Sequence, residues 1–289
     1  MENNNLLRIA IQSKGRLYED TTTLLKEAGV KVNRSERALL VRSTNFPIEV
    51  LYLRDDDIPQ TVASGIADIG IVGLNEVMER EEDVEIIQHL GLSKCHLAIA
   101  IPKTSDYTGP QWLNGKQIAT SYPHILKKFL DSNKVEAQVH VITGSVEITP
   151  LIGLGDAIFD IVSSGSTLVS NNLKEVEKIM DSDAVVVAGK HLTEEKRATI
   201  HELLFRFQAA IDAQKKKYIM MNAPRTSLNQ ILAILPESAK SPTIIPLADE
   251  KWCSVHTVLE EKHFWDCIGE LKKAGAQGIL VVPIEKIVL

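Results

Sequence analysis

The chain has 289 residues, which is comfortable for two or three domains. Its formal net charge of -6 argues against general nucleic-acid binding, which requires a basic face. Phosphate-bearing small substrates stay possible, because they need only a local pocket of hydrogen-bond donors.

Other broad classes are also disfavoured. No run reaches the length of a membrane span, and the N-terminus lacks a basic stretch followed by an apolar one, so we expect a cytoplasmic protein with no membrane partner. The three cysteines, Cys95, Cys253 and Cys267, are odd in number and show no CxxC spacing. We therefore predict idle thiols in a reducing compartment rather than disulfides or a zinc site.

The first ~95 residues alternate between strand-like and helix-like stretches. Residues 17–28 carry apolar side chains at helical spacing and stop at Gly29, and a second helix is predicted from Pro59. The predicted strands are residues 7–11, 38–41, 48–53 and 69–72. This alternation is typical of an α/β layer structure.

A second unit is predicted to begin near Cys95. A helix carrying Leu126, Phe129 and Leu130 on one face follows the second of its strands. The predicted strands are residues 97–101, 118–119, 139–142 and 158–162. Residues 184–188 also form a strand, but its pattern alone does not assign it to either unit.

The C-terminal part has a different character. A long helix is predicted over residues 193–218, with Thr193 as its cap and Lys215, Lys216 and Lys217 at its solvated end. The predicted elements that follow are residues 218–221, 228–235, 243–246, 253–259, 264–274 and 278–282. Their order, β-α-β-β-α-β, is that of a ferredoxin-like domain. It shows no acid/base cluster, so we interpret it as a regulatory or assembly module.

The most informative stretch is the turn after the strand at residues 158–162. The strand ends in Ser163, Ser164, Gly165, Ser166 and Thr167, and a helix-like segment follows. Outward backbone amides, hydroxyl groups and a helix N-terminus together suit a phosphate, and glycine permits close approach. Asp160, just before the turn, could accept hydrogen bonds from ribose hydroxyls. The alternative is a turn rich in Ser and Gly for conformational reasons alone.

Residues 147–168, EITPLIGLGDAIFDIVSSGSTL, resemble the signature of the ATP phosphoribosyltransferase family at every fixed position. Further family-like stretches lie along the whole chain, at residues 8–12, 15–17, 54–59, 119–124, 218–221 and 283–286. The C-terminal domain makes the chain similar to the long form of that family. The resemblance implies a two-lobed catalytic core like type II periplasmic binding proteins, plus the ferredoxin-like domain.

This fold implies specific domain bounds. Catalytic domain I comprises residues 1–95 and is completed by residues 184–217. Catalytic domain II comprises residues 96–183, and the regulatory domain residues 218–289. Substrates are expected between the two catalytic lobes.

The resemblance assigns the site for phosphoribosyl pyrophosphate (PRPP) to the turn. Asp160 is expected at the ribose hydroxyls, and Glu147 beside the ribose. The 5-phosphate is expected at Ser164, Gly165, Ser166, Thr167 and Leu168.

The resemblance also assigns residues to ATP. Gly15 and Arg16 follow the first strand, and Arg16 suits a pyrophosphate or triphosphate because its guanidinium is bidentate. Tyr122 is expected against the adenine ring, and Arg54 near the phosphates. The alternatives are a surface Arg16, a core Tyr122, and an Arg54 that belongs to a helix start together with the acids after it.

The implied reaction is the first step of histidine biosynthesis. Adenine N1 of ATP attacks C1′ of PRPP and pyrophosphate leaves, aided by Arg16, Asp160, Glu147 and by Mg²⁺ held mainly on substrate phosphates. N1 carries no proton, so no strong general base is needed. Free histidine is expected to inhibit, and the chain is expected to form dimers and hexamers.

Three other functions compete. An exported solute-binding protein could share the two-lobed fold, and a ligand-sensing regulatory module could use the last domain. A phosphoribosyltransferase with another acceptor base would keep the phosphate turn.

Overall fold

The computed structural model describes residues 6–35, 37–236 and 242–288. The chain divides into two compact units, and each is described by itself. The first comprises Met1–Thr23 and Val30–His201, and the second Leu24–Gly29 and Glu202–Leu289. None of the described helices is both long enough and apolar enough to span a bilayer.

The first unit contains a six-stranded sheet in the order β2-β3-β1-β4-β11-β5. Its central strand β1 runs parallel to β3 and β4, whereas β11 runs antiparallel to β4 and β5. The strands are β1 (Leu7–Gln12), β2 (Leu40–Arg42), β3 (Ile48–Leu53), β4 (Ile69–Gly73), β5 (Glu85–His89) and β11 (Ala184–Ala188). All five residues of β11 are buried, which explains its unbroken apolar sequence.

The helices beside this sheet are α1 (Arg16–Glu27), α2 (Ile58–Ala63) and α3 (Leu74–Arg80), and a 3-10 turn, η1 (Asp55–Asp57), precedes α2. Helix α2 buries Ile58 and Val62 against the sheet. A Cβ atom on Gly70 of β4 would lie 2.6 Å from Ile58 Cγ2, so glycine is needed for this close packing.

The second sheet of this unit has five strands in the order β10-β6-β9-β7-β8. They are β6 (Cys95–Pro102), β7 (Gln117–Thr120), β8 (Gln138–Val141), β9 (Ala157–Val162) and β10 (Leu173–Ser182). Apolar clusters lie on both faces, one of them under α4 (Pro123–Ser132) and the other reaching Leu168 of α5 (Ser166–Ser170). Two short 3-10 turns, η2 (Pro110–Leu113) and η3 (Val146–Ile148), complete this part.

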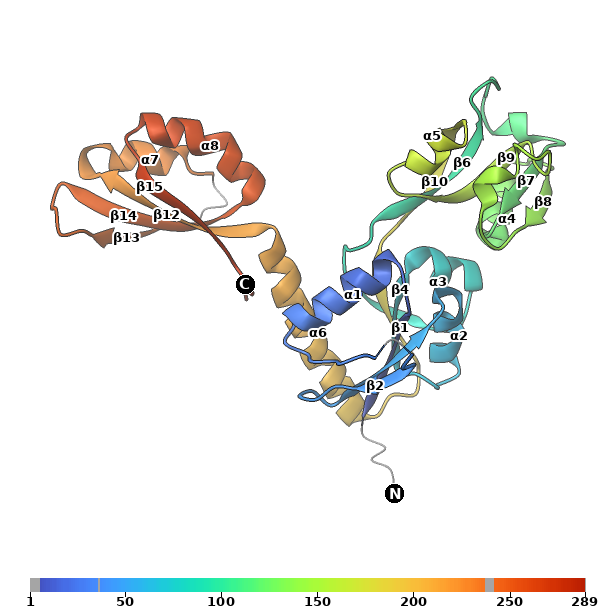
Figure 1. Cartoon of the computed structure of the whole chain (residues 1–289), viewed down its shortest axis with the longest axis horizontal. Helices are drawn as coiled ribbons and strands as arrows, with labels where there is room; N and C mark the ends of the chain where they lie inside the picture. Colours follow the sequence, from blue (N-terminus) through green and yellow to red (C-terminus); the bar gives the residue numbers. More distant parts are fainter. Residues whose placement is uncertain (1–5, 36, 237–241, 289) are drawn as a thin grey trace. The chain divides into compact units, whose positions relative to one another are not determined.

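The chain crosses twice between the two sheets, from β5 into β6 and from β10 back into β11 (Figure 1). This is the connectivity expected of a two-lobed core like type II periplasmic binding proteins. Residues 184–188, which the sequence pattern left unassigned, thus complete the first sheet.

The second unit contains the last sheet, in the order β13-β14-β12-β15 with all neighbours antiparallel. Its strands are β12 (Lys216–Pro224), β13 (Thr243–Pro246), β14 (Trp252–Glu260) and β15 (Gln277–Pro283), with a 3-10 turn η4 (Arg225–Ser227) and helices α7 (Leu228–Ile234) and α8 (Glu261–Lys273). Both helices cover one face of the sheet (Figure 1). This confirms the predicted ferredoxin-like order.

The long helix is shorter than predicted. Helix α6 spans Glu194–Gln214, and Lys216 and Lys217 belong to β12 instead of the helix end. They pair with Glu260 and Leu259 of β14, so pairing in the sheet overrides the helical pattern.

Three elements among the helices and strands have no counterpart in the prediction: α3, β5 and β10. The helix-like segment predicted after the turn is present as α5. Helix α3 buries Asn75, Glu76 and Glu79, so it lacks a purely apolar stripe. Strand β10 has two irregularities in its pairing with β6, which break the period of two that marks a strand.

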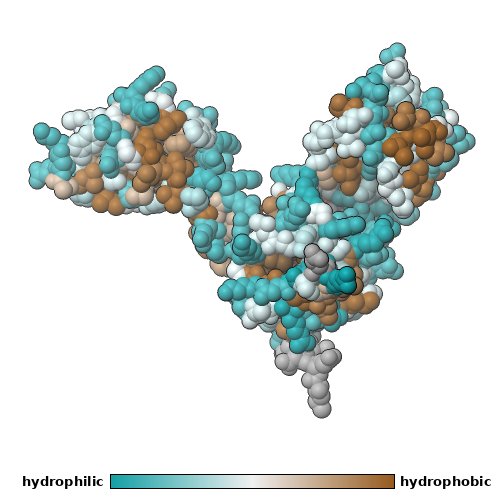
Figure 2. Space-filling view, in the orientation of Figure 1, coloured by the Kyte–Doolittle hydropathy of each residue, from teal (hydrophilic) through white to brown (hydrophobic). Residues whose placement is uncertain are grey.

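Hydrophilic residues cover much of the face seen in Figure 2, with hydrophobic patches between them. Strongly exposed apolar side chains include Leu151 at 81% and Ile152 at 57%, both on the loop before β9. They belong to a run of exposed apolar side chains that also includes Ile148 and Leu154.

Candidate active site

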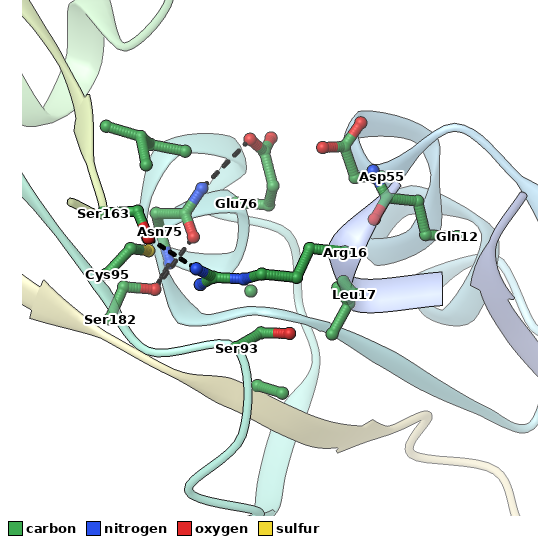
Figure 3. Close-up of a pocket in the computed structure, with 13 residues that line it drawn as sticks. Gln12, Arg16, Leu17, Asp55, Asn75, Glu76, Ser93, Cys95, Ser163 and Ser182 are labelled. Carbon is green, nitrogen blue, oxygen red and sulfur yellow. Dashed lines mark hydrogen bonds between the residues drawn. The ribbon is translucent and has the colours of Figure 1, made fainter. Parts of the chain in front are cut away.

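A pocket with a volume of about 340 Å³ opens in the first unit, where strands of both sheets end (Figure 3). Gln12 closes β1, Gly73 closes β4, and Ser163 follows β9. The carboxyl ends of strands are where open α/β sheets bind ligands. The pocket is therefore the candidate active site.

Arg16 links the two sheets across this pocket. It is the first residue of α1, and it follows Gly15, whose φ of +91° lies in the region that favours glycine. Arg16 Nη1 donates to Ser163 Oγ at 2.5 Å, and Nη2 donates to the Lys94 carbonyl at 2.8 Å. The guanidinium keeps further N–H donors for an anion.

The turn after β9 is exposed and holds unused donors. Gly165 has a φ of +73° and precedes α5. Among the described residues, no protein atom accepts a hydrogen bond from the backbone amides of Gly165, Thr167 or Leu168. The hydroxyls of Ser164 and Ser166 lie 3.0 Å apart. Amides and hydroxyls gathered in this way suit a phosphate group.

Two carboxylates lie near this turn. Asp160 Oδ1 accepts a hydrogen bond from the amide of Ile161 at 2.8 Å. Burial is the main cause that raises the pKa of Asp160 to about 6; the Ile161 amide lowers it and the charge of Glu147 raises it, and both effects are included in that value. Asp160 and Glu147 are thus close enough to interact electrostatically.

A buried polar cluster forms another wall of the pocket. Asn75 Nδ2 lies 3.2 Å from Glu76 Oε1 and 3.2 Å from the Tyr122 hydroxyl, and Ser182 Oγ donates to Asn75 Oδ1 at 2.8 Å. Glu76 and Asn75 are each 5% exposed. Burial, followed by the charge of Asp55, raises the pKa of Glu76 to about 7.

Tyr122 lies behind this cluster. It is 7% exposed, packs in the apolar core under α4 and does not line the pocket. Burial and the neighbouring Glu76 raise the pKa of its hydroxyl, so the tyrosine stays protonated. In this conformation the ring offers little free surface for stacking.

Arg54 follows β3 and points to the acids of η1. Its Nε donates to Asp56 Oδ1 at 3.1 Å, and its side chain is 71% exposed. Of this stretch, Asp55 lines the pocket and Arg54 does not. Of the residues predicted for the site, Arg16 lines the pocket and contacts Ser163 at the start of the turn. The others do not line it: Gly15, Arg54, Tyr122, Glu147, Asp160 and residues 164–168.

Four residues that line the pocket are not predicted from the sequence as site residues. Asp55 is expected at a helix start, and no motif marks Asn75, Glu76 or Ser182. A usable signal was present for Asn75 and Glu76, because they directly follow Gly73 at the end of a buried strand.

The described residues contain no group of three or more His, Cys, Asp or Glu side chains able to hold a metal ion. They do not fit a preformed all-protein metal site. Mg²⁺ often binds mainly through substrate phosphates and water, which requires few protein carboxylates.

Comparisons with known proteins agree along the chain. Residues 54–209 match the family model described as ATP phosphoribosyltransferase, and residues 213–286 match that of the HisG C-terminal domain. An ATP phosphoribosyltransferase of Bacteroides thetaiotaomicron is 62% identical over 98% of this chain and 100% of the relative. One of Cytophaga hutchinsonii is 51% identical over 99% of each.

A solved structure is also similar. The ATP phosphoribosyl transferase (HisG:HisZ) complex from Thermotoga maritima superimposes with a TM-score of 0.63 at 29% identity. The match covers 72% of this chain and 99% of that one. The chain belongs to the ATP phosphoribosyltransferase family, in the long form that carries the C-terminal domain.

Proposed function

We propose that this protein transfers the phosphoribosyl group of PRPP to N1 of ATP and releases pyrophosphate, the first step of histidine biosynthesis. The observation that carries the assignment of the site is the exposed turn with the unused amides of Gly165, Thr167 and Leu168. Family membership identifies the reaction class, a pentosyl transfer.

The turn binds the 5-phosphate of PRPP. Each hydrogen bond to a charged group contributes about 1.5 to 3 kcal/mol, so three amides with the hydroxyls of Ser164, Ser166 and Thr167 suffice to hold a phosphate monoester. Leu168 contributes its amide while its side chain is buried in the core, which fixes the position of the turn.

Asp160 and Glu147 bind the ribose. A carboxylate accepts hydrogen bonds from hydroxyls, and both side chains lie on the approach to the turn. Although the pKa of Asp160 is raised to about 6, it still lies below neutral pH, so the carboxylate is mostly ionised there and able to accept from two hydroxyls.

ATP occupies the pocket beside Gly15 and Arg16. Arg16 stabilises the negative charge that grows on the leaving pyrophosphate, and its contact with Ser163 holds the guanidinium near the phosphate turn. Arg54 and Tyr122 contribute to ATP binding indirectly in this conformation: Arg54 through the acids of η1 and Tyr122 through Asn75 and Glu76.

The chemistry consists of positioning and charge stabilisation. The N1 lone pair forms the bond to C1′, and the C1′–O bond breaks with its electron pair going to pyrophosphate. No proton needs removal from N1, so a general base is not required. Mg²⁺ held on the substrate phosphates would reduce their mutual repulsion.

The domain arrangement proposed here has three parts. Residues 1–95 with 184–217 form catalytic domain I, residues 96–183 form catalytic domain II, and residues 218–289 form the regulatory domain. We further propose that histidine binds the regulatory domain as inhibitor and that the chain assembles into dimers and hexamers.

The test is direct. Purified protein with ATP, PRPP and Mg²⁺ should give pyrophosphate and a phosphoribosyl-ATP adduct in equal amounts. Pyrophosphate without the adduct, or an adduct on another base when bases compete, would reject this acceptor.

A further inference from the structure

The pocket carries both signs of charge. Arg16 lines it together with Ser163, the first residue of the turn after β9, and their N–H and hydroxyl groups suit phosphates. Asp55 and Glu76 line another part of the same pocket and are acidic. Phosphates are repelled there, so the substrate group that lies beside these carboxylates must be neutral or positively charged and must carry donors.

Glu76 is the buried member of this pair. Its Oε1 lies 3.2 Å from Asn75 Nδ2. Its Oε2 is buried and accepts no hydrogen bond from any described residue, and the Arg80 Nε lies 3.6 Å from it. A buried carboxylate oxygen with no hydrogen bond is costly even beside an arginine, so its place at the pocket wall points to a donor that arrives with a ligand.

The neighbours hold Glu76 in place. Gly73 has no side chain, and a Cβ there would lie 2.3 Å from Asn75 Oδ1, so the chain at the end of β4 leaves room for the Asn75 side chain. Ser182 fixes the other side of that amide at 2.8 Å. Asn75 in turn contacts both Glu76 and the Tyr122 hydroxyl. The carboxylate is therefore positioned before any substrate binds.

We infer that Glu76 accepts a hydrogen bond from the N6 amino group of ATP and stabilises the positive charge that the adenine acquires on attack. This rests on the proposed function. Among the groups that ATP and PRPP carry, the ribose hydroxyls and the adenine amino group are uncharged donors, and of these only the amino group gains positive charge during the reaction. Formation of the N1–C1′ bond spreads positive charge over N1, C6 and N6, while the electron pair of the broken C1′–O bond leaves with pyrophosphate. A carboxylate at N6 thus interacts more strongly with the transition state than with ATP itself.

The ionisation of Glu76 follows its surroundings. Burial and the charges of Asp55 and Asp56 raise its pKa to about 7, whereas Tyr122 and Arg80 lower it. In the free enzyme near neutral pH the group is therefore partly protonated. Approach of a cationic adenine favours the carboxylate form.

The experiment compares two acceptors in three proteins. Purine riboside triphosphate keeps the N1 lone pair but lacks the N6 amino group. The proteins are the wild type, Glu76→Gln, and Glu81→Gln as a matched control, since Glu81 is exposed at the end of the same helix and pairs with Lys128.

Glu76→Gln should lower kcat/KM for ATP by about 10- to 100-fold, mostly through kcat, and should change that for the purine analogue by less than about threefold. The KM for PRPP should stay the same, and Glu81→Gln should match the wild type throughout. Equal losses with both acceptors would overturn the inference, and would be the outcome if Glu76 contacted a ribose hydroxyl or had a structural role only.

A second measurement needs no variant. In the wild type, the preference for ATP over the purine analogue should fall as pH decreases below about 7, because protonation removes the charge on Glu76. Asp160, with a pKa of about 6, would affect both acceptors equally and so leave the ratio unchanged. A ratio independent of pH between about 6 and 8, one unit to either side of the pKa of Glu76, would overturn the inference. If the wild type formed no adduct with ATP at all, the proposed function itself would fail.

Discussion

At the scale of single residues, the site depends on donors that the protein leaves unused. Thr167 contributes an exposed hydroxyl and an amide, and only its carbonyl is occupied, by Asn171. Its side chain can therefore be changed without loss of a protein contact among the described residues.

Thr167→Val should raise the KM for PRPP by about tenfold or more, because it removes one hydrogen bond to a charged group. The KM for ATP and the thermal midpoint should change little. Ser170→Ala, at an exposed position of the same helix, is the control and should behave as the wild type. Steady-state kinetics with each substrate varied in turn would check this. An unchanged KM for PRPP in Thr167→Val would show that the Thr167 hydroxyl does not contact PRPP.

Asp160 connects activity to stability. Its folded pKa of about 6 lies above the ordinary value of 3.8, so the folded protein binds the proton more tightly than the unfolded chain. The stabilising effect of that proton is fully present below about pH 3.8 and is lost as pH rises through 6.

Asp160→Asn should therefore raise the thermal midpoint at pH 7.5, about 1.5 units above that pKa, and leave it nearly unchanged at pH 4. At the same time it should lower kcat/KM for PRPP by about 10- to 100-fold, because the amide is a weaker acceptor for ribose hydroxyls. Thermal melts at both pH values, with kinetics on the same samples, would test the pair of effects. A variant less stable at pH 7.5 would show that the carboxylate supports the fold instead of substrate.

Site residues can be predicted from the sequence where they belong to a short stretch of unusual composition. The turn with Gly165 is visible because glycine and hydroxyl residues follow an apolar strand. Glu76 leaves no such trace, since its position depends on contacts with Asn75, which is held by Ser182 from 107 residues further along the chain. Long-range contacts of this kind cannot be derived from local patterns.

At the scale of elements, helix α4 is capped by a side chain from another helix. Its own N-cap residue, Tyr122, makes no side-chain cap, and Pro123 follows with no N–H. Glu79 of α3 acts as the cap instead. Its two carboxylate oxygens accept hydrogen bonds from the backbone amides of His124 at 2.9 Å and Ile125 at 3.0 Å. Helix α3 therefore positions both Glu76 at the pocket and α4 of the second sheet.

Glu79→Ala should lower the free energy of unfolding by about 2 to 3 kcal/mol, because it leaves two amide donors at the helix start without an acceptor. Glu81→Ala, which removes an exposed ion pair with Lys128 on the same pair of helices, should have little effect. Denaturant titration of both variants would decide. Equal stability of the two would mean that water replaces the cap.

The boundaries of helices and strands are the features that local sequence patterns predict least well. Helix α6 was predicted to continue through the lysines, but Lys216 and Lys217 enter β12 because nine residues of that strand pair with β14. Helical periodicity of apolar residues located the helix correctly, and tertiary pairing determined its end.

At the scale of the whole molecule, the last sheet and its helices form a separate core. Ile219, Val255, Phe264 and Leu271 are buried together there. This part carries none of the residues assigned to ATP or PRPP, which agrees with a regulatory role.

Truncation of the protein after Lys215, which removes β12 and everything that follows it, should abolish inhibition by histidine. Phosphoribosyl transfer should remain detectable. The residue is chosen because it lies between α6 and β12, whereas a cut after Tyr218 would leave part of a strand. Activity at increasing histidine concentration, compared with the full chain, is the measurement. Because α6 also contacts the removed part, for example through Ala209 and Ile287, a melt of the shortened protein should confirm that it is folded. Inhibition that persists would place the histidine site in the catalytic domains.

The central claim is that the turn from Ser163 to Leu168 binds the phosphate of PRPP through its free amides. Amide resonances of the full protein during a PRPP titration test this most directly. The signals of Gly165, Thr167 and Leu168 should move downfield and saturate together, and Thr167→Val should weaken the transition. Saturable binding that leaves these three amides unmoved would contradict the account.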